Sequence, residues 1–445
     1  MVTPRIPDPQ LEAVSLVQAE SALAAPRLDF DDTEKLDLDV LIPLVLQRNP
    51  SLQAATAAWQ AATERIPQVT SLDDPQMRAM GGPRFNGPTF FDAFADDWDV
   101  SYFRWQCVQK FPWPGKRGLR GAIATAESDA AFQDIGEVRL HLVEAIRHAY
   151  ADYWLVVHQQ ALLEQEEQLG QEYAAALRQF IKDNVAPAYL LHKVELTRLE
   201  RQRRREELAV AEKGARGRLN TLLHRPPDCP LPFPRSLTIV PLATDIEELR
   251  QAALAHHPQY KAALTRLQAD DAAIALAEKE FYPDIEALVR FDTVWTPDDV
   301  AARPIIGIHF DLPIRKERRR AAVREAQALR AKRRAEVEQL AARILYEIQF
   351  AHDQLQRSQN QLKQYPQLLA AAQELSRQVH KQAECLDAWF EAQRQLLYFQ
   401  SRQYEDVHHC HRLLASLERA VGAPLLIVPD VDGNGFLCAK NSDSP

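Results

Sequence analysis

Apolar residues occupy every second position along short runs in two blocks of the chain, residues 75–111 and 283–314. This period of two is typical of a β-strand whose two faces meet different surroundings. Residues rich in proline, glycine and aspartate separate two such runs in each block, so each block predicts a β-hairpin. The apolar positions of the clearest runs are Phe103, Trp105 and Cys107 in the first block and Ile285, Ala287, Val289, Phe291, Ile306, Ile308, Phe310 and Leu312 in the second.

A long helical pattern follows each hairpin block. Residues 116–180 contain no proline, and residues 315–379 contain only Pro366. Apolar residues step by three and four along both, which is the seam of a coiled coil. Second helices are expected to return at 187–222 and 385–421, so the chain predicts two long helical hairpins, 116–222 and 315–421. The seam positions are Ile135, Val138, Leu142, Ala145 and Ala149, and then Val337, Ala341, Ile344, Ile348, Ala351 and Leu355.

The same order of elements occurs twice, which indicates an internal duplication with a spacing of about 200 residues. Each half is expected to begin with a helix of roughly 30 residues, followed by the β-hairpin and the helical hairpin. The predicted parts are an N-terminal tail 1–37, repeat one 38–224 (first helix 38–70), a proline-rich linker 225–244, repeat two 245–425 (first helix 245–280) and a C-terminal tail 426–445. The fold class is therefore mainly α with a small β part.

Composition agrees with long helices and narrows the class of protein. The chain has 445 residues with 46% hydrophobic and 26% charged residues and only 14 glycines. No run approaches the roughly 20 apolar residues of a membrane-spanning helix. The net charge of -9 argues against nucleic acid as a partner. The basic runs at 202–207 and 315–320 contain acidic residues and are read as solvated helix surface.

No catalytic, cofactor or metal site is expected. The five cysteines show no paired spacing, and no nucleotide-binding, serine-hydrolase or zinc-protease motif occurs in context. The N-terminus shows no recognisable export signal. Within the cluster Glu405, His408, His409, Cys410 and His411, only two side chains can share one helix face, which is too few for a metal. The stretch that begins Asp430, Asp432, Asn434 resembles the start of a calcium loop, but Asn441 stands where glutamate is needed.

Four amphipathic strands of about ten residues have the length of membrane-spanning β-strands. One chain cannot close a barrel with four strands, and open sheet edges are not tolerated in lipid, so several chains would have to pool their strands. The alternative is an ordinary hairpin packed on a soluble helical bundle. Aromatic residues that could mark a membrane interface are Trp98, Tyr102, Phe103, Trp105, Tyr282 and Trp295.

Over about residues 38–425, the chain resembles the TolC-like outer-membrane efflux proteins. These proteins are the exit ducts of tripartite bacterial export pumps. The resemblance rests on the helix starts NPSLQAA and HPQYKAA, the Asp74-Pro75 entry, the FPWPGK exit and the closing LNTLLHRPPD. It implies a homotrimer with a 12-stranded β-barrel in the outer membrane and a periplasmic α-helical barrel. It further implies no enzymatic activity, passive conduction of small molecules or metal ions, and a periplasmic adaptor and an inner-membrane pump as partners.

The turns of the helical hairpins are where the resemblance places adaptor docking and pore closure. The docking positions are Asp183, Asn184, Val185, Gln382, Ala383 and Glu384. The chain departs from the family pattern, because Asp183 and Gln382 replace turn glycines and Tyr189 and Ala388 replace acids. Glu391, with Asp387 nearby, falls at a pore-lining acid of the family, although it could equally be a solvated acid on a helix face. The rival function, a soluble coiled-coil scaffold, is favoured by the missing signal and disfavoured by the repeated order of elements.

Overall fold

The structure is a computed structural model that describes residues 35–83, 101–183, 187–237, 245–295, 299–381 and 386–425. The chain divides into two compact units, which are described separately. Unit 1 contains residues 1–54, 136–258 and 341–445, and unit 2 contains residues 55–135 and 259–340. Within the described ranges, no helix combines the length and the apolar character needed to cross a membrane.

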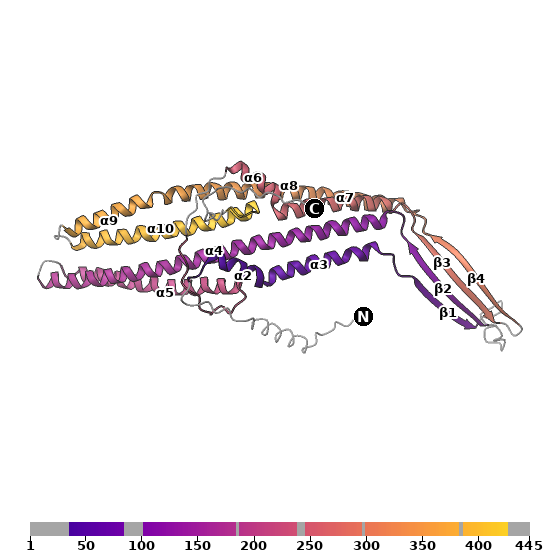
Figure 1. Cartoon of the computed structure of the whole chain (residues 1–445), viewed down its shortest axis with the longest axis horizontal. Coiled ribbons are helices and arrows are strands. Elements are labelled where there is room, and N and C mark those ends of the chain that lie inside the picture. Colours follow the sequence, from indigo (N-terminus) through magenta and orange to yellow (C-terminus); the bar gives the residue numbers. More distant parts are fainter. Residues whose placement is uncertain are drawn as a thin grey trace, which may run out of the picture. The chain divides into compact units, whose positions relative to one another are not determined.

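The order of elements in the second half of the chain follows that of the first (Figure 1). The first half contains α2 (Leu38–Arg48), α3 (Pro50–Thr70), β1 (Gln76–Pro83), β2 (Ser101–Phe111), α4 (Lys116–Lys182) and α5 (Leu190–Leu222). The second contains α6 (Ile246–His256), α7 (Pro258–Lys279), β3 (Ile285–Trp295), β4 (Val300–Phe310), α8 (Lys316–Leu362), α9 (Tyr365–Lys381) and α10 (Leu386–Val421). This order supports the duplication, which stays a prediction.

The first helix of each half was expected to be continuous, and that expectation is wrong. Each is two helices, broken at Asn49 and at His257, whose ψ angles of 123° and 119° are extended. Both residues precede a proline, and the proline ring disfavours a helical conformation in the residue before it. Asn49 then caps the second helix by accepting a hydrogen bond from the amide of Ser51 at 3.0 Å. The helix 315–379 is likewise interrupted, near Pro366 in the first turn of α9.

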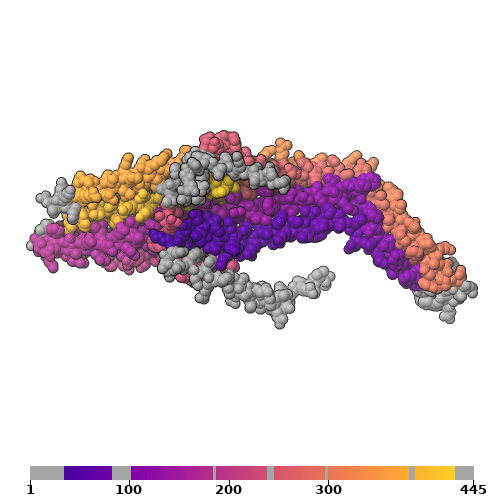
Figure 2. All heavy atoms as spheres, in the orientation of Figure 1, coloured from indigo at the N-terminus to yellow at the C-terminus, as the bar shows by residue number. Residues whose placement is uncertain are grey.

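The four strands form one antiparallel sheet in the order β1-β2-β3-β4. The pairing of β2 with β3 joins the two predicted hairpins, with Val289 of β3 opposite Cys107 of β2. Among the described strands, β1 and β4 each pair on one side only. The view in Figure 2 shows the strands with no helix laid over them. The sheet therefore has two open edges.

The core of unit 1 forms around α2, α4 and α5. Leu41, Val45, Ile146 and Leu219 are fully buried there. Tyr150 donates hydrogen bonds to the carbonyl oxygens of Leu36 at 2.9 Å and Arg235 at 3.0 Å, so the end of the predicted tail and the proline-rich linker are fastened to α4. Of the predicted seam positions in this unit, Val138, Ala145 and Ala341 are only partly buried. The others are buried, which confirms the prediction for them: Leu142, Ala149, Ile344, Ile348, Ala351 and Leu355.

In unit 2 the helices are held by polar contacts more than by a deep core. Trp59 of α3 packs edge to face on Phe132 of α4, with ring centroids 5.6 Å apart. Arg333 of α8 donates a hydrogen bond of 2.6 Å to Asp270 of α7. The sheet belongs to this unit, and α4 and α8 begin where β2 and β4 end (Figure 1).

Candidate functional site

One face of the sheet carries no charged side chain among the described strand residues. Residues paired across antiparallel strands point to the same face, so the register assigns the side of each strand residue. Several apolar side chains on this face are open to solvent, including Ile306 at 84% and Ile308 at 70% exposure. Its members are Met77, Ala79, Gly81, Phe103, Trp105, Cys107, Gln109, Phe111, Ile285, Ala287, Val289, Phe291, Thr293, Trp295, Val300, Ala302, Pro304, Ile306, Ile308 and Phe310.

The opposite face holds every arginine, lysine, histidine, aspartate and glutamate of the described strands. Its charged or protonatable members are Arg78, Arg104, Lys110, Glu286, Arg290, Asp292, Arg303 and His309. The alternation predicted from the sequence is thus present in three dimensions across all four strands. A sheet with one uncharged face and one charged face can separate an apolar medium from an aqueous one.

The predicted interface aromatics are divided between the two faces. Trp105 and Trp295 lie on the uncharged face, whereas Tyr102 pairs with Val294 on the charged face. Tyr282 precedes β3 and stacks on Trp113 with ring centroids 5.2 Å apart. Trp98 and the connecting residues around it lie outside the described part of the chain. A role in an interface stays a prediction for all of them.

Between β2 and α4 the FPWPGK segment makes a tight junction. Gly115 adopts a φ of +91°, a conformation that favours glycine. Lys116 is buried, and its Nζ donates to Asp284 Oδ1 at 2.9 Å and to the carbonyl oxygen of Tyr282 at 3.1 Å. Asp284 also accepts the amide of Trp113 at 2.9 Å. The junction therefore ties the end of β2 to the start of β3.

At the end of unit 1 where α10 begins, α4 and α10 are joined by an aromatic and polar contact. Tyr173 of α4 stacks on Phe390 of α10 with ring centroids 4.1 Å apart, and its hydroxyl donates to Asp387. The apolar residues that surround this contact are Leu169, Leu177, Ile181, Leu190, Leu191, Val194, Leu386 and Trp389. Asp387, predicted to line a pore, is thus engaged within the chain.

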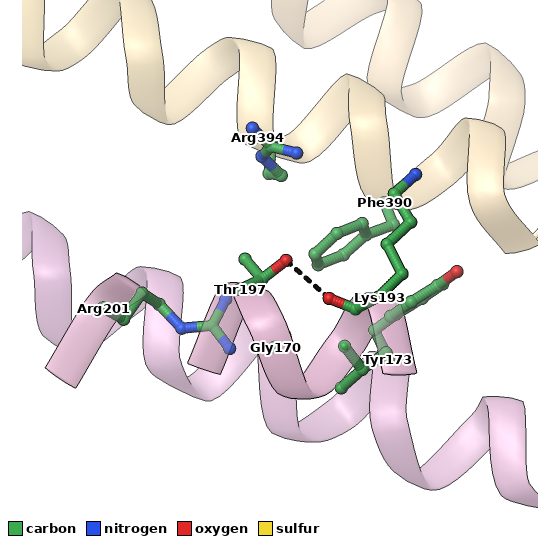
Figure 3. Close-up of a pocket in the computed structure, with 8 residues that line it drawn as sticks. Gly170, Tyr173, Lys193, Thr197, Arg201, Phe390 and Arg394 are labelled. Carbon is green, nitrogen blue, oxygen red and sulfur yellow. Dashed lines mark hydrogen bonds between the residues drawn. The ribbon is translucent and has the colours of Figure 1, made fainter. Parts of the chain in front are cut away.

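Figure 3 shows a pocket beside this contact, with side chains from α4, α5 and α10. Gly170 leaves room for Arg201, because a Cβ at this glycine would lie 2.5 Å from a guanidinium nitrogen. Burial lowers the pKa of Arg201 most, the carboxylates of Glu166 and Glu167 raise it, and the positive charges of Arg394 and Arg198 lower it, so that the pKa is lowered overall. Thr197 donates to the carbonyl oxygen of Lys193 at 2.9 Å. Because Lys193, Arg201 and Arg394 line the pocket, it is rich in positive charge.

Glu391 lies next to this pocket and is half exposed. Its carboxylate is 3.4 Å from Arg394 and 3.7 Å from Lys193, so two cations flank it. The sequence prediction did not include Tyr173, Lys193 or Arg394, because their closeness depends on how three helices pack. Only the three-residue spacing of Glu391 and Arg394 could have indicated a contact.

Among the predicted docking residues, Asp183 is exposed and accepts a hydrogen bond from Gln179 at 3.2 Å. The other five, which are Asn184, Val185, Gln382, Ala383 and Glu384, lie outside the described residues. In the histidine cluster, His408 makes a 2.8 Å hydrogen bond to Asp152. Within the described ranges, no three histidine, cysteine or acidic side chains are placed to hold a metal ion. The calcium-like stretch at 430–441 also lies outside those ranges.

Comparison with known proteins gives a clear result at the level of the fold. No family model matches the chain. No curated protein matches it either. Among solved structures, the outer-membrane channel OprN is 18% identical with a TM-score of 0.73, over 91% of this chain and 96% of that one. VceC from Vibrio cholerae is 19% identical with a TM-score of 0.69, over 87% and 97% of the two chains.

The Campylobacter jejuni CmeC outer membrane channel is 13% identical with a TM-score of 0.70, over 95% of this chain and 93% of that one. Identities this low show the fold alone. The folding pattern expected from the sequence is confirmed, with long helical hairpins joined to a four-stranded antiparallel sheet. The chain has the fold of the TolC-like outer-membrane channels.

Proposed function

We propose that three copies of this chain form the outer-membrane exit duct of a tripartite efflux system, with the helical hairpins in the periplasm. The uncharged, solvent-open face of the sheet is the observation that carries the proposal. Charge at the centre of a bilayer costs several kcal/mol, and the described strands keep all their charge on the other face. OprN and CmeC are described as outer-membrane channels and VceC as an outer membrane protein, which supports the same conclusion.

The open edges of the sheet support a trimer. Unpaired backbone groups are costly in lipid, so β1 and β4 need partners there. Three copies of the four-stranded sheet supply 12 strands, an even number within the range of closed bacterial barrels. The chain would then conduct small molecules or metal ions passively, without catalysis. Its partners would be two further copies, outer-membrane lipid, a periplasmic adaptor and, through that adaptor, an inner-membrane pump.

Cell fractionation and purification test the proposal. We expect the full-length protein in the outer membrane, soluble only in detergent, and migrating as a heat-resistant trimer. Electron microscopy should show a hollow stalk beneath a membrane-embedded ring. A protein that is monomeric or dimeric and soluble without detergent would support the coiled-coil scaffold and overturn the exit duct.

The turns of the two helical hairpins are the proposed docking sites for the adaptor, through Asp183, Asn184, Val185, Gln382, Ala383 and Glu384. In the same proposal Glu391 lines the pore and Asp387 helps to close it. The stacked Tyr173 and Phe390 support closure, because they hold α4 against the first turns of α10, which include Asp387.

A Glu391→Ala variant tests the lining role. Removal of three symmetric carboxylates should lower the cation preference of single channels in planar bilayers by about two-fold, since a ring of acids attracts cations. The effect is expected to be modest because Arg394 and Lys193 flank the carboxylate. Glu195→Ala, an exposed acid of α5 paired with Arg198, is the control. Unchanged conductance and ion preference in Glu391→Ala would remove Glu391 from the pore.

A further inference from the structure

The charges on the polar face of the sheet are not evenly distributed. The register places Arg78, Gln106 and Arg290 in one row across the strands. The adjacent row, two residues further along, contains Arg104, Asp292 and Arg303. Two residues of a strand span about 7 Å, so the four arginines lie on one face within two adjacent rows, and Asp292 is the one acid among the described residues of these rows. We call Arg78, Arg104, Arg290, Arg303 and Asp292 the arginine patch.

Asp292 compensates only part of this charge. Arg104 binds it through Nε at 2.9 Å, and the Nε of Arg290 lies 3.3 Å from the same carboxylate oxygen. Arg303 is opposite Asp292 in the register, is exposed, and forms no ion pair with any described residue. Arg78 is exposed, and within the described part of the chain its contact is with the amide oxygen of Gln76 at 3.5 Å. Among the described residues of these two rows, four arginines against one aspartate leave an excess of three positive charges per chain.

Nearer the helices, the same face is closer to neutral. Lys110 lies 3.9 Å from Asp284, and Glu286 lies 3.2 Å from His309. The excess positive charge is therefore local to the arginine patch, in a chain whose net charge is -9. The described strands contain no arginine outside this patch, so their arginine charge is concentrated and not spread along the face.

We infer that the arginine patch makes the strand-lined section of the duct favour anions, so that the exported compounds include molecules carrying carboxylate, phosphate or sulfonate groups. The inference rests on the proposed function, because the polar face borders the lumen only if the sheet closes into a barrel. Three copies would then bring nine positive charges to one level of the lumen. Rings of arginine select anions in pores, and guanidinium groups bind carboxylate and phosphate in a two-pronged geometry.

Residues 84–100, which lie outside the described structure, carry charge of their own and would affect the ion preference of every variant equally. The experiment therefore compares variants of the patch with each other. That segment contains Asp92, Asp96, Asp97 and Asp99. The test variant is Arg78→Gln with Arg303→Gln, which removes the two arginines of the patch that pair with no carboxylate of the described residues. It leaves the contacts of Arg104 and Arg290 with Asp292 in place. The matched control is Arg78→Lys with Arg303→Lys, which keeps the charge at both positions.

Reversal potentials in a potassium chloride gradient across planar bilayers give the chloride-to-potassium permeability ratio. We expect the glutamine variant to lower this ratio by about three-fold near 0.1 M salt, where the screening length is about 10 Å. The lysine variant should keep the wild-type ratio. At 1 M salt the difference should nearly vanish, because the screening length falls to about 3 Å.

A second measurement does not depend on an open channel. Binding of a trisulfonated pyrene dye to the detergent-solubilised trimer, followed by fluorescence anisotropy, should weaken by about three-fold in the glutamine variant and not in the lysine variant. If the protein is a trimer, but the glutamine substitutions change neither the permeability ratio nor the dye binding, the proposed anion preference is overturned and the exit duct is not. A protein that is monomeric and soluble without detergent would instead overturn the exit duct.

Discussion

Buried and partly buried charged residues connect segments that are distant in the sequence. Lys116 lies at the start of α4 and binds Asp284, which precedes β3. Asp152 of α4 binds His408 and Arg412 of α10, both at 2.8 Å. Removal of one partner from such a pair leaves the other charge without compensation, which costs more than the loss of an exposed pair. These contacts therefore make specific predictions for single substitutions.

Replacement of Lys116 by methionine should destabilise the junction between sheet and helices. The lysine side chain is 2% exposed and the carboxylate of Asp284 is 20% exposed, so the carboxylate would lose its main partner in a poorly solvated place. We expect a loss of about 2 to 3 kcal/mol, seen as a lower thermal unfolding midpoint of the purified protein. Lys110→Met is the control, because Lys110 is 43% exposed and 3.9 Å from the same carboxylate. Equal effects of the two substitutions would contradict the prediction.

Asp152 should make stability depend on pH in the acid range. Burial raises its pKa, but hydrogen bonds and charge from His408 and Arg412 outweigh burial and leave the pKa below its usual 3.8. A carboxyl whose pKa is lower in the folded state adds stability at neutral pH, and that contribution is lost as the pH falls through the lowered pKa. Asp152→Asn should therefore lower the unfolding midpoint at pH 7, with a gap to wild type that closes below pH 3.8.

The exposed acid Glu195 provides the control for this pH series. It pairs with Arg198 at the surface of α5, where solvent screens the interaction. Glu195→Gln should therefore follow the wild-type curve at neutral pH. A gap between Asp152→Asn and wild type that persists unchanged below pH 3 would show that the carboxylate charge does not provide the stability.

At the scale of elements, the helix ends depend on local rules that the structure confirms. Prolines at 50 and 258 begin α3 and α7 after a break, and Gly422 ends α10 with a φ of +79°. The amide of Gly422 donates to the carbonyl oxygen of Glu418 at 2.9 Å, as expected for a left-handed helix end. A proline thus sets the position of each of these two breaks, and a glycine sets the end of α10.

Gly422→Ala should be destabilising by about 2 kcal/mol, because alanine disfavours this φ. Its Cβ would also lie 2.9 Å from the Cα of His257, a backbone atom that cannot easily move. Gly214 in the middle of α5 is the matched comparison, since nothing lies within 4 Å of a Cβ there. Gly214→Ala should raise stability by about 0.5 to 1 kcal/mol. Thermal unfolding midpoints of both variants test this prediction. A lower midpoint for Gly214→Ala than for wild type would contradict it.

At the scale of the whole molecule, the proposed function requires the two faces of the sheet to differ, with the uncharged face toward lipid. Adjacent residues of β4 offer a direct comparison, because Ile306 lies on the uncharged face and Ile305 lies on the charged face next to Arg290. Ile306→Asp should cost about 2 kcal/mol per chain in lipid and sharply reduce the heat-resistant trimer in outer membranes. Ile305→Asp should be tolerated. Equal yields of the two variants would favour a soluble scaffold.

Much of this fold could be predicted from the sequence, and the reason is local. Periods of two and of three to four residues depend only on the chain's own geometry, so the hairpins and the long helices were found, and so were buried seam positions such as Ile348 and Leu355. The breaks at Asn49 and His257 were missed, although the prolines that follow them carried the signal. The contact that joins α4 to α10 was only partly predicted, since Asp387 was named but Tyr173 was not. The two residues are far apart in the sequence, and no local rule brings them together.

The sequence by itself determined which strand residues alternate, where the long helices run and that the two halves share one order of elements, because these follow from side-chain period and from proline. Only the tertiary structure decided that β2 pairs with β3, which aligns the four strands in one register. That register places four arginines and Asp292 in two adjacent rows of one face and leaves the opposite face of the described strands without charge. The physical reason is that a shift of one residue moves every side chain of a strand to the other face, and pairing between distant strands fixes that shift.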